Sequence, residues 1–267
     1  MTTVGEVCDF LNEFAPLNLA ESWDNVGLLI GRSDRIVSRI MTCLTLTPDI
    51  ATEAIASKTN LIVSHHPVLF RGTKRLSDAT IEGDMLLKLI ETGIAVYSPH
   101  TAFDSAREGI NQQIANALGL QDVRPLNYFS PESPDGSGRW GVLPEVISIQ
   151  ELLDRVRQTL GAKHLEYCGN GREHVRQLAI GCGAAESFLS EAIANHCDTF
   201  ITGEARFHTV LEARSKGVNL ILTGHYHSER PAVETLAKKI AAAFPVLEVF
   251  ASMQECNPLS LWTGNDP

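Results

Sequence analysis

Apolar residues recur along this chain with two alternating periods. In residues 4–14 they lie three or four positions apart, which predicts an amphipathic helix. Thr47 is followed by Pro48, a pair that favours the start of a second helix, which we expect to extend to about residue 57. Further strands are expected over residues 26–30, 36–46, 61–63 and 94–97, and helices over residues 81–91 and 110–118. This alternation of strand and helix predicts an α/β fold.

A polar stretch interrupts the pattern near the middle of the chain. Residues 126–139 are rich in proline, glycine and serine and contain few aliphatic residues, which is typical of a junction. We therefore predict an N-terminal α/β lobe of residues 1–130 and a C-terminal α/β lobe of residues 131–267. In the second lobe we expect strands over residues 140–143, 175–180, 199–201, 220–222 and 246–249, and helices over residues 149–160, 187–196, 207–215 and 232–243.

Composition and charge exclude several classes of function. The chain has 267 residues, of which 44% are hydrophobic, enough for a large globular core. Its formal net charge is −10 and it has no long basic run, so nucleic acid is not an expected partner. The N-terminus lacks the pattern of a signal peptide, and no stretch approaches the roughly 20 apolar residues that span a bilayer, so we expect a cytoplasmic protein without a membrane partner. The six cysteines show no Cys-x-x-Cys spacing and are interpreted as packing residues.

Two segments far apart in the chain resemble each other. Residues 60–66 read NLIVSHH and residues 219–227 read NLILTGHYH, so an apolar strand leads twice into a histidine pair. Ligands in open α/β sheets gather beyond the carboxyl ends of strands, so the residues there are candidates for a site. Four such ends carry His65 and His66; His100 and Asp104; Glu204 and His208; and His225, His227 and Glu229.

These side chains are candidate metal ligands. Imidazole and carboxylate without thiolate suit zinc, iron, manganese or nickel in an open, reactive site. His65 and His66 are adjacent, and neighbouring side chains on an extended segment diverge, so the pair favours two ions over one. The spacings from His100 to Asp104 and from His225 to Glu229 place each pair on one face if the segment is helical. Pro231, however, suggests that the last helix begins only near residue 231, and the second spacing then belongs to a turn.

Each candidate also has a structural interpretation. His208 and His227 alone are equally consistent with capping or hydrogen-bonded histidines. Asp104 can cap a turn, and Glu229 can favour a helix N-terminus. The other three histidines lie on or beside polar stretches and are interpreted as solvated: His164, His174 and His196.

Weaker candidates lie in nearby loops. Asp24 suits a position behind a metal ligand, although its spacing alone favours a simple turn residue. Cys182, between two glycines, is interpreted as a packing residue because the usual nucleophile motif is absent. Three basic residues after the histidine pair could hold a small anionic substrate, or could simply be solvated: Arg71, Lys74 and Arg75.

Four motifs in order give the chain a family resemblance. ESWDNVGLLIG, SHHPVLF, PHTAFDSAREGIN and TGHYHSE begin at residues 21, 64, 99 and 223. Together they resemble the NIF-three-like proteins, also called GTP cyclohydrolase I type 2 homologues. The resemblance implies a two-lobed α/β fold with a duplicated core, a dinuclear metal centre between the lobes, and a homohexamer built as a trimer of dimers. It also implies that Glu229 bridges two ions, that His100 lies close by, and that the ligands are His65, His66, Asp104, His225 and Glu229.

The chain also departs from the family pattern. Its length leaves no room for the inserted middle domain of longer members, so it resembles the short form. The family's glycine-serine-glycine turn is replaced by Ala184-Ala185-Glu186, and His227 stands where a small apolar residue is usual. That histidine could be an added ligand, a proton shuttle or a surface residue.

The expected function follows from the paired ions. Two divalent ions about 3.5–4 Å apart suit hydrolysis of phosphoesters, amides or a purine-like ring. The sequence contains no P-loop pattern, so the link to GTP comes from the resemblance alone. The alternative is a non-catalytic metal-binding scaffold or a regulatory partner protein. A shared centre requires His66 and His225 to lie within about 10 Å of each other.

Overall fold

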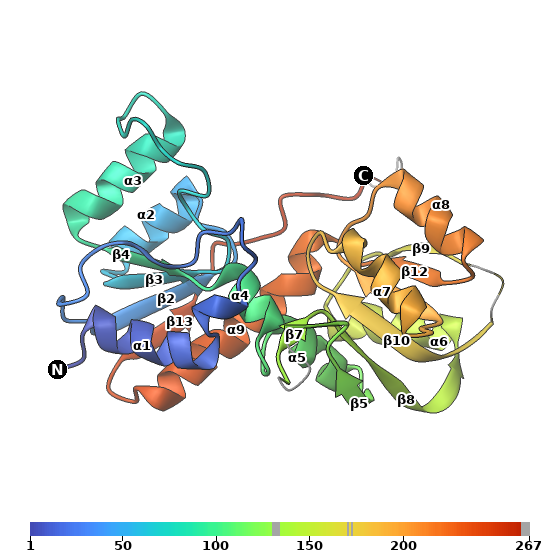
Figure 1. The fold of residues 1–267 in the computed structure, drawn as a ribbon. Coiled ribbons are helices and arrows are strands. Elements are labelled where there is room, and N and C mark those ends of the chain that lie inside the picture. Colours follow the sequence, from blue (N-terminus) through green and yellow to red (C-terminus); the bar gives the residue numbers. More distant parts are fainter. Residues whose placement is uncertain (130–133, 170, 172, 263–267) are drawn as a thin grey trace.

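The structure is a computed structural model that describes residues 1–129, 134–169, 171 and 173–262. It is a two-lobed α/β fold in which each lobe is built around a sheet (Figure 1). The first sheet has the strand order β1-β4-β3-β2-β13 and the second has the order β5-β8-β10-β11-β12-β9. The duplicated α/β pattern expected from the sequence is therefore confirmed.

The first sheet is mostly parallel. Strands β13, β2, β3 and β4 run parallel, and only β1 is antiparallel to its neighbour β4. Its strands are β1 (Gly27–Ile30), β2 (Arg39–Cys43), β3 (Leu61–Ser64), β4 (Ala95–Ser98) and β13 (Glu248–Ala251). The helices of this lobe are α1 (Val4–Phe14), α2 (Pro48–Ala56) and α3 (Ile81–Thr92). Thr3 and Glu6 form a capping box at the start of α1, and Pro48 occupies the first turn of α2 as its fixed φ angle favours.

The second sheet repeats the parallel core. Strands β10, β11 and β12 are parallel, whereas β8, β5 and β9 pair antiparallel at the flanks. Its strands are β5 (Gln121–Arg124), β8 (Arg139–Ser148), β9 (Glu166–Cys168), β10 (His174–Gly181), β11 (Thr199–Thr202) and β12 (Asn219–Leu222). Its helices are α6 (Ile149–Thr159), α7 (Leu189–Ala194) and α8 (Phe207–Ser215). A small ribbon of β6 (Asn127–Tyr128) and β7 (Gly136–Ser137) flanks the predicted junction.

The chain crosses between the lobes more than once. Helix α9 (His225–Ala243) starts beyond β12 of the second sheet and packs against β2 and β13 of the first. Strand β13, which the sequence analysis counted with the second half, pairs with β2, and β5, which precedes residue 130, pairs with β8. The division at residue 130 stays a prediction for the domains, but the two sheets do not follow it.

Helix α9 corrects one expectation. It begins at His225 and contains Pro231 in its interior, so the proline does not mark the start of the helix. An internal proline removes one backbone hydrogen bond, crowds the carbonyl four residues earlier and restricts the residue before it, and here tertiary packing of α9 outweighs that cost. His225 and Glu229 are therefore one helical turn apart.

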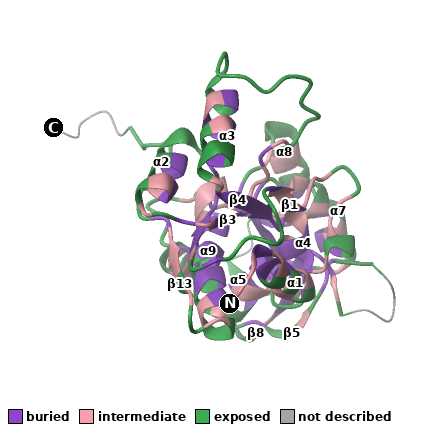
Figure 2. Ribbon diagram, turned by 90° about the vertical axis from the view of Figure 1, so that its left-hand side faces the viewer, coloured by how far each residue is buried: buried purple, intermediate pink, exposed green. Residues whose placement is uncertain are grey.

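The hydrophobic core joins the lobes. One cluster of buried residues includes Val63 and Tyr97 from the first sheet, Leu178 and Ile221 from the second, and Leu236 from α9. Figure 2 shows that buried residues concentrate in strands such as β3 and β4 and along one side of α9. Short helices α4 (His100–Ser105) and α5 (Ile110–Ala117) connect the first sheet to the second. This shared core fixes the carboxyl ends of strands from both lobes opposite each other.

All six cysteines are free, and no described helix is long and apolar enough to cross a membrane.

Candidate metal centre

The two resembling strand ends meet at one place. His65 and His66 directly follow β3, and His225 follows β12 after Thr223 and Gly224. Nε2 of His66 lies 3.3 Å from Nε2 of His225, far inside the limit for a shared centre. Gly224 has φ +81°, a left-handed conformation that lets the chain turn abruptly from strand into helix α9. Each lobe thus contributes its own histidine end to one cleft.

His65 lies in an environment that leaves its ring without partners. It is 1% exposed, and neither ring nitrogen makes a hydrogen bond with any other described residue. Its Nε2 atom lies 3.5 Å from Asp104 Oδ1 and 4.0 Å from Glu229 Oε1. Burial lowers its pKa well below the ordinary value, so the ring is neutral and has a lone pair to offer. A buried imidazole without hydrogen bonds is costly unless something else binds it.

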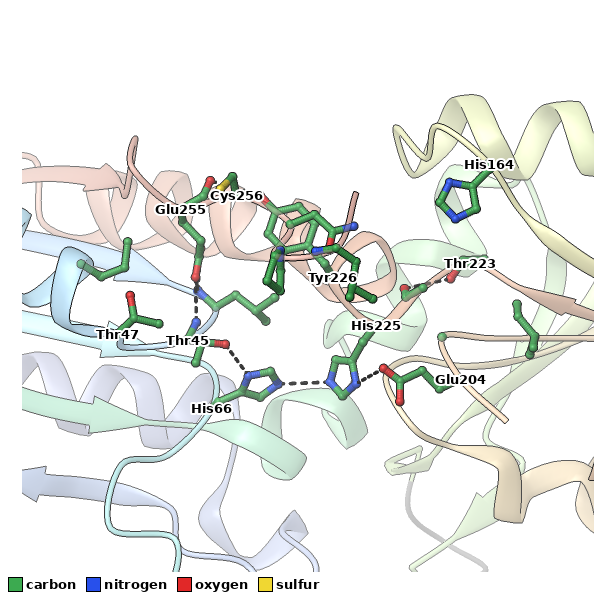
Figure 3. A pocket seen from close by; sticks show the side chains of 18 of the residues that line it. Thr45, Thr47, His66, His164, Glu204, Thr223, His225, Tyr226, Glu255 and Cys256 are labelled. Carbon is green, nitrogen blue, oxygen red and sulfur yellow. Dashed lines mark hydrogen bonds and ion pairs between the residues drawn. The ribbon is translucent and has the colours of Figure 1, made fainter. Parts of the chain in front are cut away.

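His66 and His225 are each held from behind. Nδ1 of His66 lies 2.7 Å from Oγ1 of Thr45, and Nδ1 of His225 lies 3.2 Å from Oε1 of Glu204. Figure 3 shows the row from Thr45 through the two rings to Glu204. The carboxylate of Glu204 favours a proton on Nδ1 of His225, and both contacts direct the Nε2 atoms of the two rings inward.

Glu229 joins the two histidine ends. Its Oε2 atom lies 3.1 Å from Nε2 of both His66 and His225, and its side chain is 4% exposed. Burial alone would raise the pKa of Glu229, but hydrogen bonds from His225 and His66 hold it below the ordinary value. The same contact with Glu229 raises the pKa of His225 to about 9. The carboxylate is therefore ionised and shared.

Asp104 completes the buried side of the cluster. It lies on α4, one turn after His100, as the spacing predicted for a helix. Burial, followed by the charge of Glu229, raises the pKa of Asp104 to about 7. Its Oδ1 atom lies 3.3 Å from Sγ of Cys182, so that cysteine packs directly behind a candidate ligand.

Asp24 holds His100 in place, which the turn interpretation did not foresee. Nδ1 of His100 lies 2.7 Å from Oδ1 of Asp24, and the hydroxyl of Thr101 donates to Oδ2 at 2.5 Å. Burial alone would raise the pKa of Asp24, but these hydrogen bonds lower it to about 2. The His100 ring lies 5.3 Å from the His65 ring, centroid to centroid, at the edge of the cluster.

A glycine that the sequence analysis did not single out also shapes the site. Gly183 follows β10 with φ +63°, and a Cβ atom there would lie 2.3 Å from Oε1 of Glu229. Its N–H donates to Oγ of Ser228, which in turn donates to the carbonyl of His225. The only sequence signal was the glycine pair around Cys182.

The turn Ala184-Ala185-Glu186 follows Gly183. Glu186 accepts a hydrogen bond from the Arg206 backbone at 2.6 Å and so ties this turn to the start of α8.

Two candidate histidines lie away from this cluster. His208 is exposed on α8 beside Phe207. Nε2 of His227 lies 3.3 Å from Nδ2 of Asn257, and its ring lies near the Leu160 carbonyl. Three basic candidates are fully on the surface of the loop beyond Phe70: Arg71, Lys74 and Arg75.

A cavity of about 800 Å³ opens beside the cluster. His66, Glu204 and His225 form part of its wall, and the start of α2 and residues 254–259 form other parts (Figure 3). His164, expected to be solvated, also lines it. Among the described lining residues there is no lysine or arginine, and the loop of Arg71, Lys74 and Arg75 is not part of the wall.

The chain is similar to known proteins over most of its length. The model of the Duf34/NIF3 (NGG1p interacting factor 3) family matches residues 2–258. The chain belongs to the Duf34/NIF3 family. A GTP cyclohydrolase 1 type 2 homolog of Clostridium acetobutylicum is 34% identical to it over 241 residues and covers 90% of both chains. The GTP cyclohydrolase 1 type 2 of Helicobacter pylori strain J99 is 33% identical over 265 residues, which is 98% of this chain and 100% of that protein.

Solved structures share the fold. A Staphylococcus aureus protein superposes with a TM-score of 0.88 at 25% identity, over 98% of this chain and 99% of that one. A Bacillus cereus protein related to NIF3 superposes with a TM-score of 0.87 at 20% identity, with the same coverage. In this Duf34/NIF3 chain the histidine and carboxylate cluster could hold a metal ion, with ligand atoms in each of three groups within 4.8 Å of one another. The groups are His65, His66 and His100; His66, His225 and Glu229; and His65, Asp104 and Glu229.

Proposed function

We propose that this protein is a metal-dependent hydrolase that uses two divalent ions in the cleft between its lobes. The observation that carries the proposal is the position of Glu229, which belongs to two ligand groups at once. One group adds His66 and His225, and the other adds His65 and Asp104. A carboxylate shared in this way can bridge two ions, and the five residues are the set that the family resemblance implied.

The residues fit such a pair of ions. The buried ring of His65, without a hydrogen bond among the described residues, gains the partner that it otherwise lacks. The donors are imidazole and carboxylate, which suits zinc, iron, manganese or nickel. Thr45 and Glu204 orient two of the rings from behind, as is usual for metal-bound histidines.

The chain's own groups prepare the site for hydrolysis. When bound, a pair of divalent ions lowers the pKa of water and stabilises negative charge that develops on oxygen. Asp24 holds the proton of His100 at Nδ1, so the Nε2 atom is free to accept a proton at the edge of the cluster. The cavity beside His66 and His225 gives the substrate access.

The proposed substrates are phosphoesters, amides or a purine-like ring. The name of the Helicobacter pylori relative makes GTP the first compound to test. No described lysine or arginine lines the cavity, so the ions would be the main holders of an anionic part of the substrate. We therefore do not include Arg71, Lys74 and Arg75 among the proposed substrate contacts.

The test compares metal-loaded and metal-depleted protein on a panel of hydrolase substrates. The panel contains GTP, guanosine, simple phosphoesters and amides, and metal content is measured in parallel. Turnover that disappears with a chelator and returns with one added metal supports the hydrolase. Protein that retains its ions but turns over no compound supports the alternative, a non-catalytic metal-binding scaffold or regulatory partner.

We also propose a homohexamer built as a trimer of dimers. Family membership supports it, together with large apolar side chains that lie exposed on the single chain, among them Ile81, Phe207 and Trp262. Light scattering of the metal-loaded protein at micromolar concentration should give six times the mass of one chain. A monomer mass would contradict this proposal.

A further inference from the structure

The segment after β13 lies across the cleft between the lobes. In Figure 1 the end of the chain runs from the first lobe toward α8 of the second. The backbone N–H of Met253 donates to Glu53 of α2 at 2.9 Å, and Arg230 of α9 donates to the carbonyl of Ser252 at 2.9 Å. Residues 254–259 line the cavity next to His66 and His225. The segment is therefore anchored and forms part of the site.

Within this segment, Glu255 makes hydrogen bonds to the loop after β2. Its carboxylate accepts hydrogen bonds from the backbone N–H groups of Leu44 at 2.9 Å and of Thr45 at 2.7 Å. Nε of Arg230 lies 2.9 Å from its Oε2 atom, and the Glu255 side chain is 7% exposed. A buried carboxylate with these partners holds the loop in a single position.

Thr45 carries that position to the candidate metal centre. Its hydroxyl lies 2.7 Å from Nδ1 of His66, and Nε2 of the same ring faces His225 at 3.3 Å and Glu229 at 3.1 Å. A hydroxyl that accepts a proton from Nδ1 would stabilise the tautomer in which Nε2 can bind an ion. Two hydrogen-bonded steps thus connect Glu255 to the nitrogen that faces the cluster.

We propose that Glu255 is a positioning residue for His66 and that it acts through Thr45. This proposal depends on the proposed function only in requiring that His66 binds an ion. The carboxylate fixes the backbone of Thr45, the hydroxyl fixes the rotation and tautomer of the ring, and the ring presents Nε2 to the cleft. Loss of such an outer partner weakens metal binding by about 10–100-fold. The C-terminal segment then helps to build the metal centre as well as covering it.

The experiment is a double-mutant cycle on metal affinity. Thr45→Val removes the hydroxyl and keeps the shape, and we expect it to weaken one of the two ions by about 10–100-fold. Glu255→Ala should have a similar effect, and the double variant should lose no more than the larger single loss, because both changes break one connection. Asn257→Ala is the matched control, since it lies in the same segment and contacts His227 instead of the loop after β2.

A conservative variant guards against simple loss of folding. Glu255→Ala leaves Arg230 buried without its carboxylate, whereas Glu255→Gln keeps an oxygen that can accept from Leu44 and Thr45. We expect Glu255→Gln to retain metal affinity within a few-fold. Losses that add in the double variant, or an equal loss in Glu255→Gln and Glu255→Ala, would overturn the proposal.

A second measurement follows the His66 ring directly. In the zinc-loaded protein, NMR should show the Nδ1 proton of His66 protected from exchange with water by its hydrogen bond to Thr45, and this protection should be lost in Thr45→Val and Glu255→Ala but not in Asn257→Ala. Unchanged protection in the first two variants contradicts the positioning role. Absence of turnover contradicts only the hydrolase, so the two proposals fail separately.

Discussion

The two histidine ends use almost the same strand sequence but present their ligands differently. After β3 the chain stays irregular, and the adjacent rings of His65 and His66 lie 5.2 Å apart, centroid to centroid, with different surroundings. After β12 the chain turns at Gly224 into α9, and His225 and Glu229 lie one turn apart on the same face. Adjacent residues of an irregular segment here bring two rings to the cluster, whereas helical residues four apart share one face. A repeated strand motif therefore yields two rings on one side and a ring with a carboxylate on the other.

The surroundings of the two ends differ as much as their backbones. His65 is 1% exposed and burial lowers its pKa, whereas His225 is 34% exposed and Glu229 raises its pKa to about 9. For His65 burial penalises the charged ring more than the charge of Glu229 favours it, whereas for His225 the hydrogen bond to Glu229 favours the charged ring. One strand end is thus prepared as a neutral donor, while the other stays protonated until a metal displaces its proton.

The largest effect is expected where the two ends share a group. Glu229→Gln keeps the volume but removes the negative charge that would offset repulsion between two divalent ions, so one ion should be lost or greatly weakened. His227→Ala, in the same motif, should retain both ions or change affinity by at most about 10–100-fold. Metal counting on both variants decides this. Two ions in Glu229→Gln with loss in His227→Ala would show that the ligand set is wrong.

A substitution just after a third strand, β10, should affect metal binding nearly as much. Gly183→Ala forces a left-handed residue, at about 1–2 kcal/mol, and also places a Cβ atom against Glu229. Gly161→Ala is the matched control, because Gly161 has φ +62° with no atom within 4 Å of its added Cβ. We expect both to lower the free energy of unfolding, and only Gly183→Ala to lose metal. Urea unfolding and metal analysis measure the two effects, and equal metal content would contradict the close approach to Glu229.

The pKa contrast predicts opposite pH effects in the metal-free protein. The folded pKa of His225, about 9, lies above its ordinary value of 6.5, so its stabilisation is present below that ordinary value and is lost as pH rises toward 9. The folded pKa of His65 lies below 6.5, so its contribution is present above that value and is lost as pH falls. We expect the free energy of unfolding to depend less on pH on the alkaline side in His225→Asn, and less on the acid side in His65→Asn. The same pH dependence in both variants would contradict the difference between His65 and His225.

The smallest effect is expected in the loop that follows the first histidine pair. Arg71, Lys74 and Arg75 are exposed and lie outside the cavity wall. Changing all three to alanine should alter the free energy of unfolding by no more than about 0.5 kcal/mol and leave the metal content unchanged. A large loss of substrate affinity in this variant would restore the anion-binding role that the sequence suggested.

The sequence by itself determined the element types and the identity of the main candidates. Apolar period and strand-end position identified β3, β12 and the residues His65, His66, Asp104, His225 and Glu229, because these signals are local. The four ordered motifs also identified the family. The same local signals wrongly predicted that α9 begins near Pro231. It begins at His225, because the packing of that helix against β2 and β13 outweighs the effect of the proline.

Only the tertiary structure decided which of these residues meet. Three contacts join segments distant in sequence: the pairing of β13 with β2, in which Glu248 lies opposite Arg39, the hydrogen bond between His100 and Asp24, and the approach of Gly183 to Glu229. His227 and His225 lie two positions apart, yet helix α9 directs one toward Asn257 and the other toward His66. Spacing can say which side chains share a face of one element. Which face turns toward the cleft depends on how a core common to both lobes packs, and no local pattern contains that information.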